Sequence, residues 1–210
     1  MTRRNALLRP ALLALAAVAL SGCLGGLLGG KPAQLYRFGQ APAAASDAAP
    51  AAGSVGVFRA GGTFAREAAG DKILAITGGE AQYIAQSRWA APAEVLFNQA
   101  VLAAFDAAPG RVRLLSRGEQ GRTSHALRLD VRNFETRYDN GAEAAPTVVV
   151  RVRAALARDK DQGLGPERIF EARIPAASNR VGSIVAAYDQ AVGQVLGEVV
   201  RWTESQVGAG

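Results

Sequence analysis

An apolar stripe near the C-terminus constrains the fold more than any other feature of the sequence. Between residues 181 and 202, valine, isoleucine, tyrosine and tryptophan recur at intervals of three and four residues. That spacing places the side chains on one broad face of an α-helix, which must cover a sheet or a partner. We expect the helix to begin at a cap formed by Ser178 or Asn179, and its apolar stripe runs from Val181 to the indole of Trp202.

The segments before this helix alternate apolar and polar residues, as half-buried strands do. The alternation slips by one residue near Arg132-Asn133, which predicts a β-bulge. A second amphipathic helix is expected to open at Pro92 and to end at Pro109-Gly110. These elements predict a two-layer α+β domain, with a mostly antiparallel sheet packed against two amphipathic helices. The expected strands are 35–38, 55–58, 72–76, 82–85, 112–114, 127–138, 148–156 and 170–174.

The N-terminus has the three parts of a secretory signal peptide. Three arginines are followed by the run Ala11 to Leu20, which contains only alanine, leucine and valine, and then by small residues. The run ends in Leu20-Ser21-Gly22-Cys23, which contains the only cysteine of the chain and resembles the lipobox of bacterial lipoprotein precursors. The resemblance implies cleavage before Cys23 and lipidation of its thiol. An uncleaved membrane anchor is the alternative, but it needs about 20 apolar residues.

Composition then divides the chain into three parts. Residues 1–22 are expected to be a signal peptide, 23–53 the lipidated cysteine with a Gly-, Ala- and Pro-rich flexible tether, and 54–207 one domain. The formal charge of +6 comes from 24 basic and 18 acidic residues. Removing the three arginines of the signal leaves 21 against 18, or about +3, which disfavours a nucleic-acid partner.

Catalytic motifs are not recognisable in the sequence. His125 is the only histidine, and it lies on the apolar phase of a strand beside Ser124, without the surroundings of a nucleophile elbow. No cluster of His, Cys and carboxylate residues predicts a metal site, and no phosphate-binding loop predicts a nucleotide cofactor. The sequence therefore indicates a protein that is not an enzyme.

Two features could contact a partner. Trp202 could anchor a partner if the last turns of its helix overhang the sheet, because tryptophan is enriched at interface hot spots; the alternative is that Trp202 completes the core. A row of arginines on the polar strand phases could bind acidic protein patches or lipid headgroups, or simply form a solvated face. The row comprises Arg111, Arg113, Arg128, Arg132, Arg151 and Arg153.

The order of several short motifs resembles a known family. After the lipobox come Tyr36-Arg37-Phe38, then Arg88-Trp89 with Pro92 opening a helix, then Leu127 to Val131 running into Phe134-Glu135, and finally the amphipathic helix. This series resembles the ABC-type transport auxiliary lipoproteins, which include the paraquat-inducible protein C lipoproteins. Tyr36, Arg88, Trp89 and Pro92 are the family-motif positions, and the family supplies no catalytic residues.

The resemblance implies a non-catalytic, periplasm-facing lipoprotein held on the membrane through Cys23. Its implied partners are ABC transporter subunits and a substrate-binding protein of the mammalian-cell-entry type, in systems that move lipids between the two membranes. Leu24 stands where an inner-membrane retention signal would have Asp, which by resemblance favours the outer membrane. A scaffold for outer-membrane or secretion-complex assembly is the alternative function, and a lipid-anchored hydrolase is a third.

Overall fold

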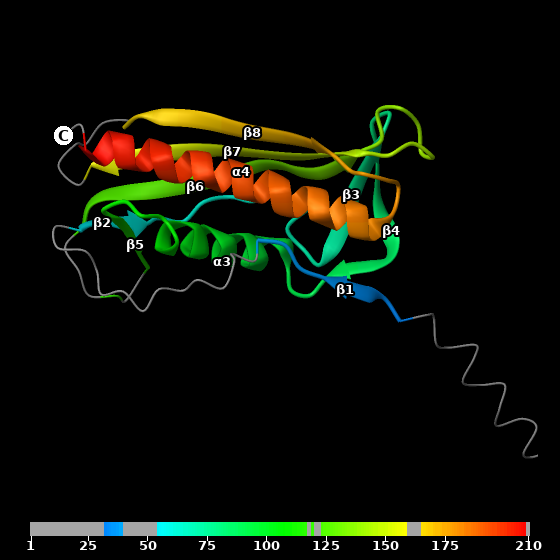
Figure 1. The fold of residues 1–210 in the computed structure, drawn as a ribbon, viewed down its shortest axis with the longest axis horizontal. Coiled ribbons are helices and arrows are strands. Elements are labelled where there is room, and N and C mark those ends of the chain that lie inside the picture. The colour runs from blue at the N-terminus through cyan, green and yellow to red at the C-terminus, as the bar shows by residue number, and fades with distance from the viewer. Residues whose placement is uncertain (1–31, 40–53, 117–118, 120–122, 159–164, 209–210) are drawn as a thin grey trace, which may run out of the picture. The chain divides into compact units, whose positions relative to one another are not determined.

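A computed structural model describes residues 32–39, 54–116, 119, 123–158 and 165–208. Cys23 and most of the expected tether lie outside these described residues. Figure 1 shows the arrangement of the elements. In chain order they are β1 (Gln34–Tyr36), β2 (Val55–Arg59), β3 (Lys72–Thr77), β4 (Glu80–Trp89), α3 (Ala93–Asp106), β5 (Val112–Leu115), β6 (Thr123–Arg137), β7 (Thr147–Arg158), β8 (Glu167–Pro175) and α4 (Val181–Gly208).

The long strand β6 organises the sheet. One of its edges pairs antiparallel with β7 along the whole strand, and β7 pairs antiparallel with β8. Its other edge pairs parallel with β2 near its start and parallel with β3 near its end. β2 also pairs parallel with β5, and β3 forms an antiparallel hairpin with β4.

The sheet is therefore mixed, and the expectation of a mostly antiparallel sheet is wrong. Among the described strands, β1 pairs with β4, three other pairs are parallel (β2 with β5, β2 with β6, β3 with β6) and three are antiparallel (β3 with β4, β6 with β7, β7 with β8). Parallel neighbours need long crossover connections, whereas hairpins need only short turns. Here the chain forms β4, α3 and β5 between β3 and β6, so β2 and β3 pair with a strand that is distant in the sequence. The alternation within each strand does not reveal such long-range pairs.

The predicted bulge is confirmed. The register between β6 and β7 shifts between Val131 and Asn133, so that Arg132 is the extra residue. The shift keeps Leu129 and Val131 before the bulge on the same buried face as Phe134 after it. Because of the bulge, apolar side chains from both halves of β6 face the same core, although their alternation in the sequence slips by one residue.

Both predicted helices are present and cover one face of the sheet (Figure 1). The α4 stripe is buried against β7, β8 and α3, as the periodicity predicts. The expected cap is wrong, because Arg180 directly precedes the helix and its carbonyl accepts the Ile184 N–H at 3.0 Å. The Asn179 amide instead donates to the Ala142 carbonyl and accepts from the Tyr138 hydroxyl.

The segment just after β1 packs into the core. Phe38 is 3% exposed, and its ring centroid lies 4.9 Å from Trp89 and 5.0 Å from Phe134. Gly39 has φ +69°, and a Cβ on it would lie 2.5 Å from the Ala100 Cβ on α3. The Gly39 N–H also donates to the Asp189 carboxylate on α4 at 2.7 Å. This short segment thus joins the two helices and extends the folded part N-terminal of Ser54.

Candidate functional site

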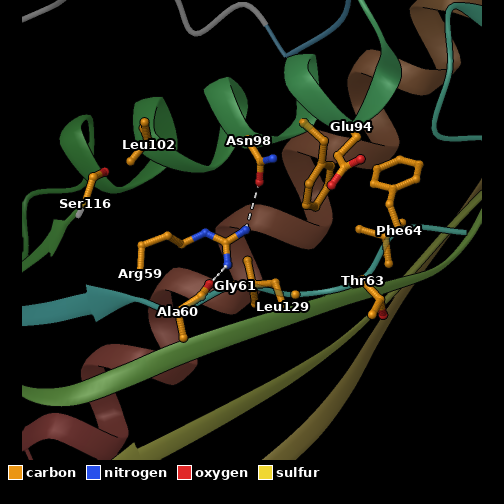
Figure 2. Close-up of a pocket in the computed structure, with 13 residues that line it drawn as sticks. Arg59, Ala60, Gly61, Thr63, Phe64, Glu94, Asn98, Leu102, Ser116 and Leu129 are labelled. Carbon is orange, nitrogen blue, oxygen red and sulfur yellow. Dashed lines mark hydrogen bonds between the residues drawn. The ribbon is translucent and has the colours of Figure 1, made fainter.

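A cleft of about 340 Å³ opens between α3 and the chain that follows β2. We call it the Arg59 cleft, after the side chain that Figure 2 shows reaching from the end of β2 towards Asn98 on α3. Its apolar wall consists of Phe64, Phe97, Leu102, Leu129 and Val131. Its polar wall is formed by Arg59, Thr63, Glu94, Asn98 and Ser116.

Arg59 is the chemically distinctive residue of the cleft. It continues the inward phase of Val57, so its side chain enters the interior side of the sheet rather than pointing to solvent. Its Nη1 donates to the Ala60 carbonyl at 2.8 Å, and its Nη2 donates to Asn98 Oδ1 at 2.9 Å. Burial lowers the pKa of this guanidinium. Among the described residues no carboxylate lies within ion-pairing distance of it.

The floor of the cleft is fixed by backbone bonds along β6. The Ala60 N–H donates to the Leu127 carbonyl at 2.9 Å, and the Val131 N–H donates to the Thr63 carbonyl at 2.8 Å. Between these bonds Gly62 lies directly on β6, where a Cβ would be 1.8 Å from the Leu129 carbonyl oxygen. A larger residue at position 62 would lift this segment from the strand and open the cleft.

Asp130 anchors the same segment from the opposite face of the sheet. Its carboxylate is almost fully buried and accepts the Thr63 N–H at 3.0 Å and the Thr63 hydroxyl at 2.9 Å. Arg128 and Arg153 complete the site at 3.1 and 3.2 Å. Burial opposes ionisation, but the bonds from Thr63 and Arg128 outweigh it and hold the pKa of Asp130 below its usual value. The carboxylate thus stays charged and fixes the loop that forms the cleft.

The predicted partner residues Arg151 and Arg153 lie on the outer sheet face, away from the helices, among carboxylates. Arg151 pairs with Glu171 at 3.4 Å, and Arg153 pairs with both Glu167 and Asp130. On this face the ion pairs of the described residues join five arginines to five carboxylates, so their formal charges cancel. They are Arg128, Arg137, Arg151, Arg153 and Arg173 with Asp130, Glu135, Asp139, Glu167 and Glu171.

Trp202, the other predicted contact, lies in the core at the end of the sheet. Its side chain is 7% exposed, and its ring meets Phe170 edge-on with the centroids 5.9 Å apart. A hollow beside it is lined by Arg168, Glu198, Arg201 and Ser205. This placement supports the packing role for Trp202 over the docking role, because little of the residue reaches the surface.

The motif residues Tyr36, Arg88, Trp89 and Pro92 come together where α3 begins. The Tyr36 carbonyl accepts the Ala90 N–H at 2.7 Å, and Arg88 pairs with Asp71 at 2.7 Å. Trp89 is buried beside Tyr188, with ring centroids 5.1 Å apart. Pro92 precedes the first helical residue. The motif therefore sets the junction between β4 and α3.

That junction also explains how α3 begins without a side-chain cap. Carbonyls of the β2–β3 connection accept its first N–H groups: Gly70 from Ala93 at 2.9 Å and Ala69 from Glu94 at 3.2 Å. Backbone groups from another segment thus satisfy donors that a serine or aspartate side chain commonly satisfies.

His125 is buried, and its Nδ1 lies 2.8 Å from the hydroxyl of the neighbouring Ser124. In the part of the chain that the structure describes, no group of three or more His, Cys, Asp or Glu residues is placed to hold a metal ion. None of the described helices is both long and apolar enough to span a membrane.

The Arg59 cleft was not predicted from the sequence, although the sequence contains one signal for it. Val55, Val57 and Arg59 share one phase of a strand, so an arginine occupies a position where the pattern calls for an apolar residue. The rest of the cleft could not be foreseen, because Asn98, which bonds to Arg59, and Leu129, which lines the cleft, come from elements distant in the sequence.

The fold is that of a small α+β domain in which one layer of helices covers a mixed sheet. The Arg59 cleft lies beside α3, the shorter of the two helices. Residues 38–200 match the family described as the ABC-type transport auxiliary lipoprotein component. The match covers most of the chain, so this protein belongs to that family. No curated protein matches the sequence significantly.

Solved structures share the fold. Protein XCC0632 from Xanthomonas campestris, of family DUF330, is 26% identical with a TM-score of 0.64, over 74% of this chain and 86% of that one. An uncharacterized protein is 15% identical with a TM-score of 0.62, over 82% and 99%. The hypothetical protein CT253 from Chlamydia trachomatis is 9% identical with a TM-score of 0.51, over 75% and 99%. These last two likenesses establish the fold alone.

Proposed function

We propose that this protein is a periplasm-facing lipoprotein, anchored through Cys23, that acts as a non-catalytic auxiliary subunit of an envelope lipid transport system. Its partners would be ABC transporter subunits and a substrate-binding protein of the mammalian-cell-entry type. The observation that carries the proposal is the family match over residues 38–200, joined to the lipobox at Leu20-Ser21-Gly22-Cys23. The absence of Asp after the cysteine supports the outer membrane as its location.

The surface of the domain is consistent with a role in binding. The outer sheet face carries a balanced lattice of ion pairs, which presents specific hydrogen-bonding groups without a strong field of one sign. Such a face suits a protein partner of complementary shape more than a charged lipid surface, because Arg128, Arg151 and Arg153 already have carboxylate partners. We therefore keep Arg151 and Arg153 as proposed contacts for a protein partner.

A genetic test separates this role from that of an assembly scaffold. Strains lacking this protein, lacking the transporter ATPase, or lacking both are compared for the lipid composition of the two membranes. If the protein and the ATPase act in the same transport system, the double deletion should give the same change in lipid composition as either single deletion. The Cys23→Ser chain should then fail to restore the wild-type composition. Additive changes, or loss of outer-membrane proteins without a lipid change, would favour the scaffold.

A further inference from the structure

Among the residues that the structure describes, the Arg59 guanidinium has no carboxylate partner, and the cleft that it enters has an apolar wall. Arg59 uses two of its five N–H groups within the described structure, on Ala60 and Asn98, both neutral acceptors. A partly buried charge facing only neutral acceptors is costly, and an anion that reaches it forms strong charge-assisted bonds. The remaining donors of Arg59 therefore favour an anionic group.

The rest of the wall fits an alkyl chain. Phe64, Phe97, Leu129 and Val131 line the cleft, and Leu102 at its mouth is 37% exposed. A cleft of about 340 Å³ lies at the small end of ligand sites in proteins. A volume of this size accommodates a polar head group with one short alkyl chain, rather than a lipid with two long alkyl chains.

The backbone around the cleft disfavours an extended peptide. Peptides that add to a sheet need a row of unpaired backbone groups. Here Ala60 and Ala65 already bond to β6 through the Leu127 and Val131 carbonyls, at 2.9 Å each. Recognition must therefore come from side chains, a charge at one end and apolar contacts along the wall.

We propose that the Arg59 cleft binds the anionic head of a single-chain amphiphile, a carboxylate or a phosphate monoester, with the alkyl chain against Phe64 and Phe97. Glu94 also lines the cleft, one helical turn before Asn98 on α3, and Figure 2 shows it apart from the Arg59 guanidinium. Its carboxylate repels an anion that binds at the wrong end, so the head is directed to Arg59. This binding does not depend on which partner the lipoprotein serves.

The test is calorimetric titration of the full chain in phosphatidylcholine nanodiscs, with empty nanodiscs as the blank. Octanoate, octyl phosphate and octanol are the ligands. We expect one of the two anions to saturate a single site, identifying the head, and octanol to bind at least about tenfold more weakly. The proposal is overturned if neither anion saturates a site, or if octanol binds as well as they do.

Three variants locate the binding. Arg59→Gln is expected to weaken the anion at least about tenfold, whereas Arg113→Gln, a half-buried arginine on β5 outside the cleft, leaves it within about twofold. Leu102→Glu, an exposed position that should not affect folding, is expected to weaken binding similarly by placing a charge at the mouth. Unchanged binding in both Arg59→Gln and Leu102→Glu would overturn the proposal.

Two further measurements distinguish an anionic amphiphile from other ligands of the cleft. Glu94→Gln is expected to leave the anion's affinity unchanged or to raise it, because a repelling charge is removed. A tenfold loss of anion affinity in Glu94→Gln would contradict the proposal, because neither octanoate nor octyl phosphate carries a positive group with which Glu94 could pair. A peptide with a free C-terminal leucine that saturates the cleft when octanoate does not would assign the cleft to a protein partner.

Discussion

Asp130 shows how one buried charge holds a functional loop. Its carboxylate is 2% exposed and fixes Thr63, whose backbone bonds to β6 form the floor of the Arg59 cleft. Asp130→Asn removes the charge and changes one acceptor into a donor facing arginine. We expect a loss of about 1–3 kcal/mol in the free energy of unfolding at neutral pH, measured by chemical denaturation. Asp139→Asn, on a more exposed ion pair, is the control and should cost less than about 1 kcal/mol.

The same residue predicts a pH dependence. The pKa of Asp130 is held below its usual value in the folded protein, so its ionised form stabilises the fold. That contribution is complete above the pKa of the unfolded chain, about 3.9, and is lost as the pH falls through the lower folded-state pKa. The stability difference between wild type and Asp130→Asn should therefore shrink below about pH 4. A difference that stays constant or grows on acidification would contradict this.

Gly39 is the residue that lets the N-terminal segment lie across the helices. Its φ of +69° disfavours any L side chain, and a Cβ would meet Ala100 at 2.5 Å. Gly39→Ala should lower the free energy of unfolding by at least about 1–2 kcal/mol, because both the backbone and the contact are strained. Gly61→Ala, with open space around the added methyl, serves as the control and should change stability by less than about 0.5 kcal/mol. Equal effects of the two substitutions would show that the segment is not held where the structure places it.

At the scale of elements, α4 combines a long apolar stripe with an indole near its end. Trp202 is buried against Phe170. We expect Trp202→Ala to cost about 3–5 kcal/mol of stability in thermal or chemical unfolding. Ile169→Ala, on β8 with 53% of the side chain exposed, is the control and should cost less than about 0.5 kcal/mol. An unchanged melting temperature combined with weaker partner binding would restore Trp202 as a docking residue.

Elements were more predictable from the sequence than their partners. Periodicity located both helices and placed the bulge at Arg132, because burial of one face is a property of each segment alone. The parallel neighbours of β6 were missed, since pairing depends on crossovers between distant segments. The cap of α3 was missed for the same reason: the acceptors at Ala69 and Gly70 come from the β2–β3 connection.

The candidate site was less predictable than the fold. A row of arginines was predicted from the sequence, but the ion pairs of Arg128, Arg151 and Arg153 within it were not, because these pairs depend on which carboxylates lie beside them in the folded sheet, such as Glu171 opposite Arg151. Arg59 stands on an apolar phase of β2, and that break in the pattern was the one visible sign of the cleft. Such a break is a useful marker, because proteins depart from consistent patterning mainly at functional or strained positions.

At the scale of the whole molecule, the proposed membrane anchor requires a lipid on Cys23. Mass spectrometry of the protein isolated from membranes should find Cys23 at the N-terminus with an acyl-bearing group, because the lipobox precedes it. Cys23→Ser should release the chain from the membrane or block its processing, since stable anchoring needs more than one acyl chain. An unmodified Cys23, or a retained segment 1–22, would contradict the anchor.

We propose that this domain serves an ABC transport system, and co-purification from native membranes measures directly whether the transporter subunits bind to it. The tagged protein is isolated after brief cross-linking, with the Cys23→Ser chain as the control, and its partners are identified and quantified by mass spectrometry. We expect the wild type to recover a transporter ATPase, its membrane subunit and a mammalian-cell-entry-type protein in a fixed ratio, and the control to recover none of them. Recovery of outer-membrane or secretion-assembly proteins in that fixed ratio, without transporter subunits, would contradict it.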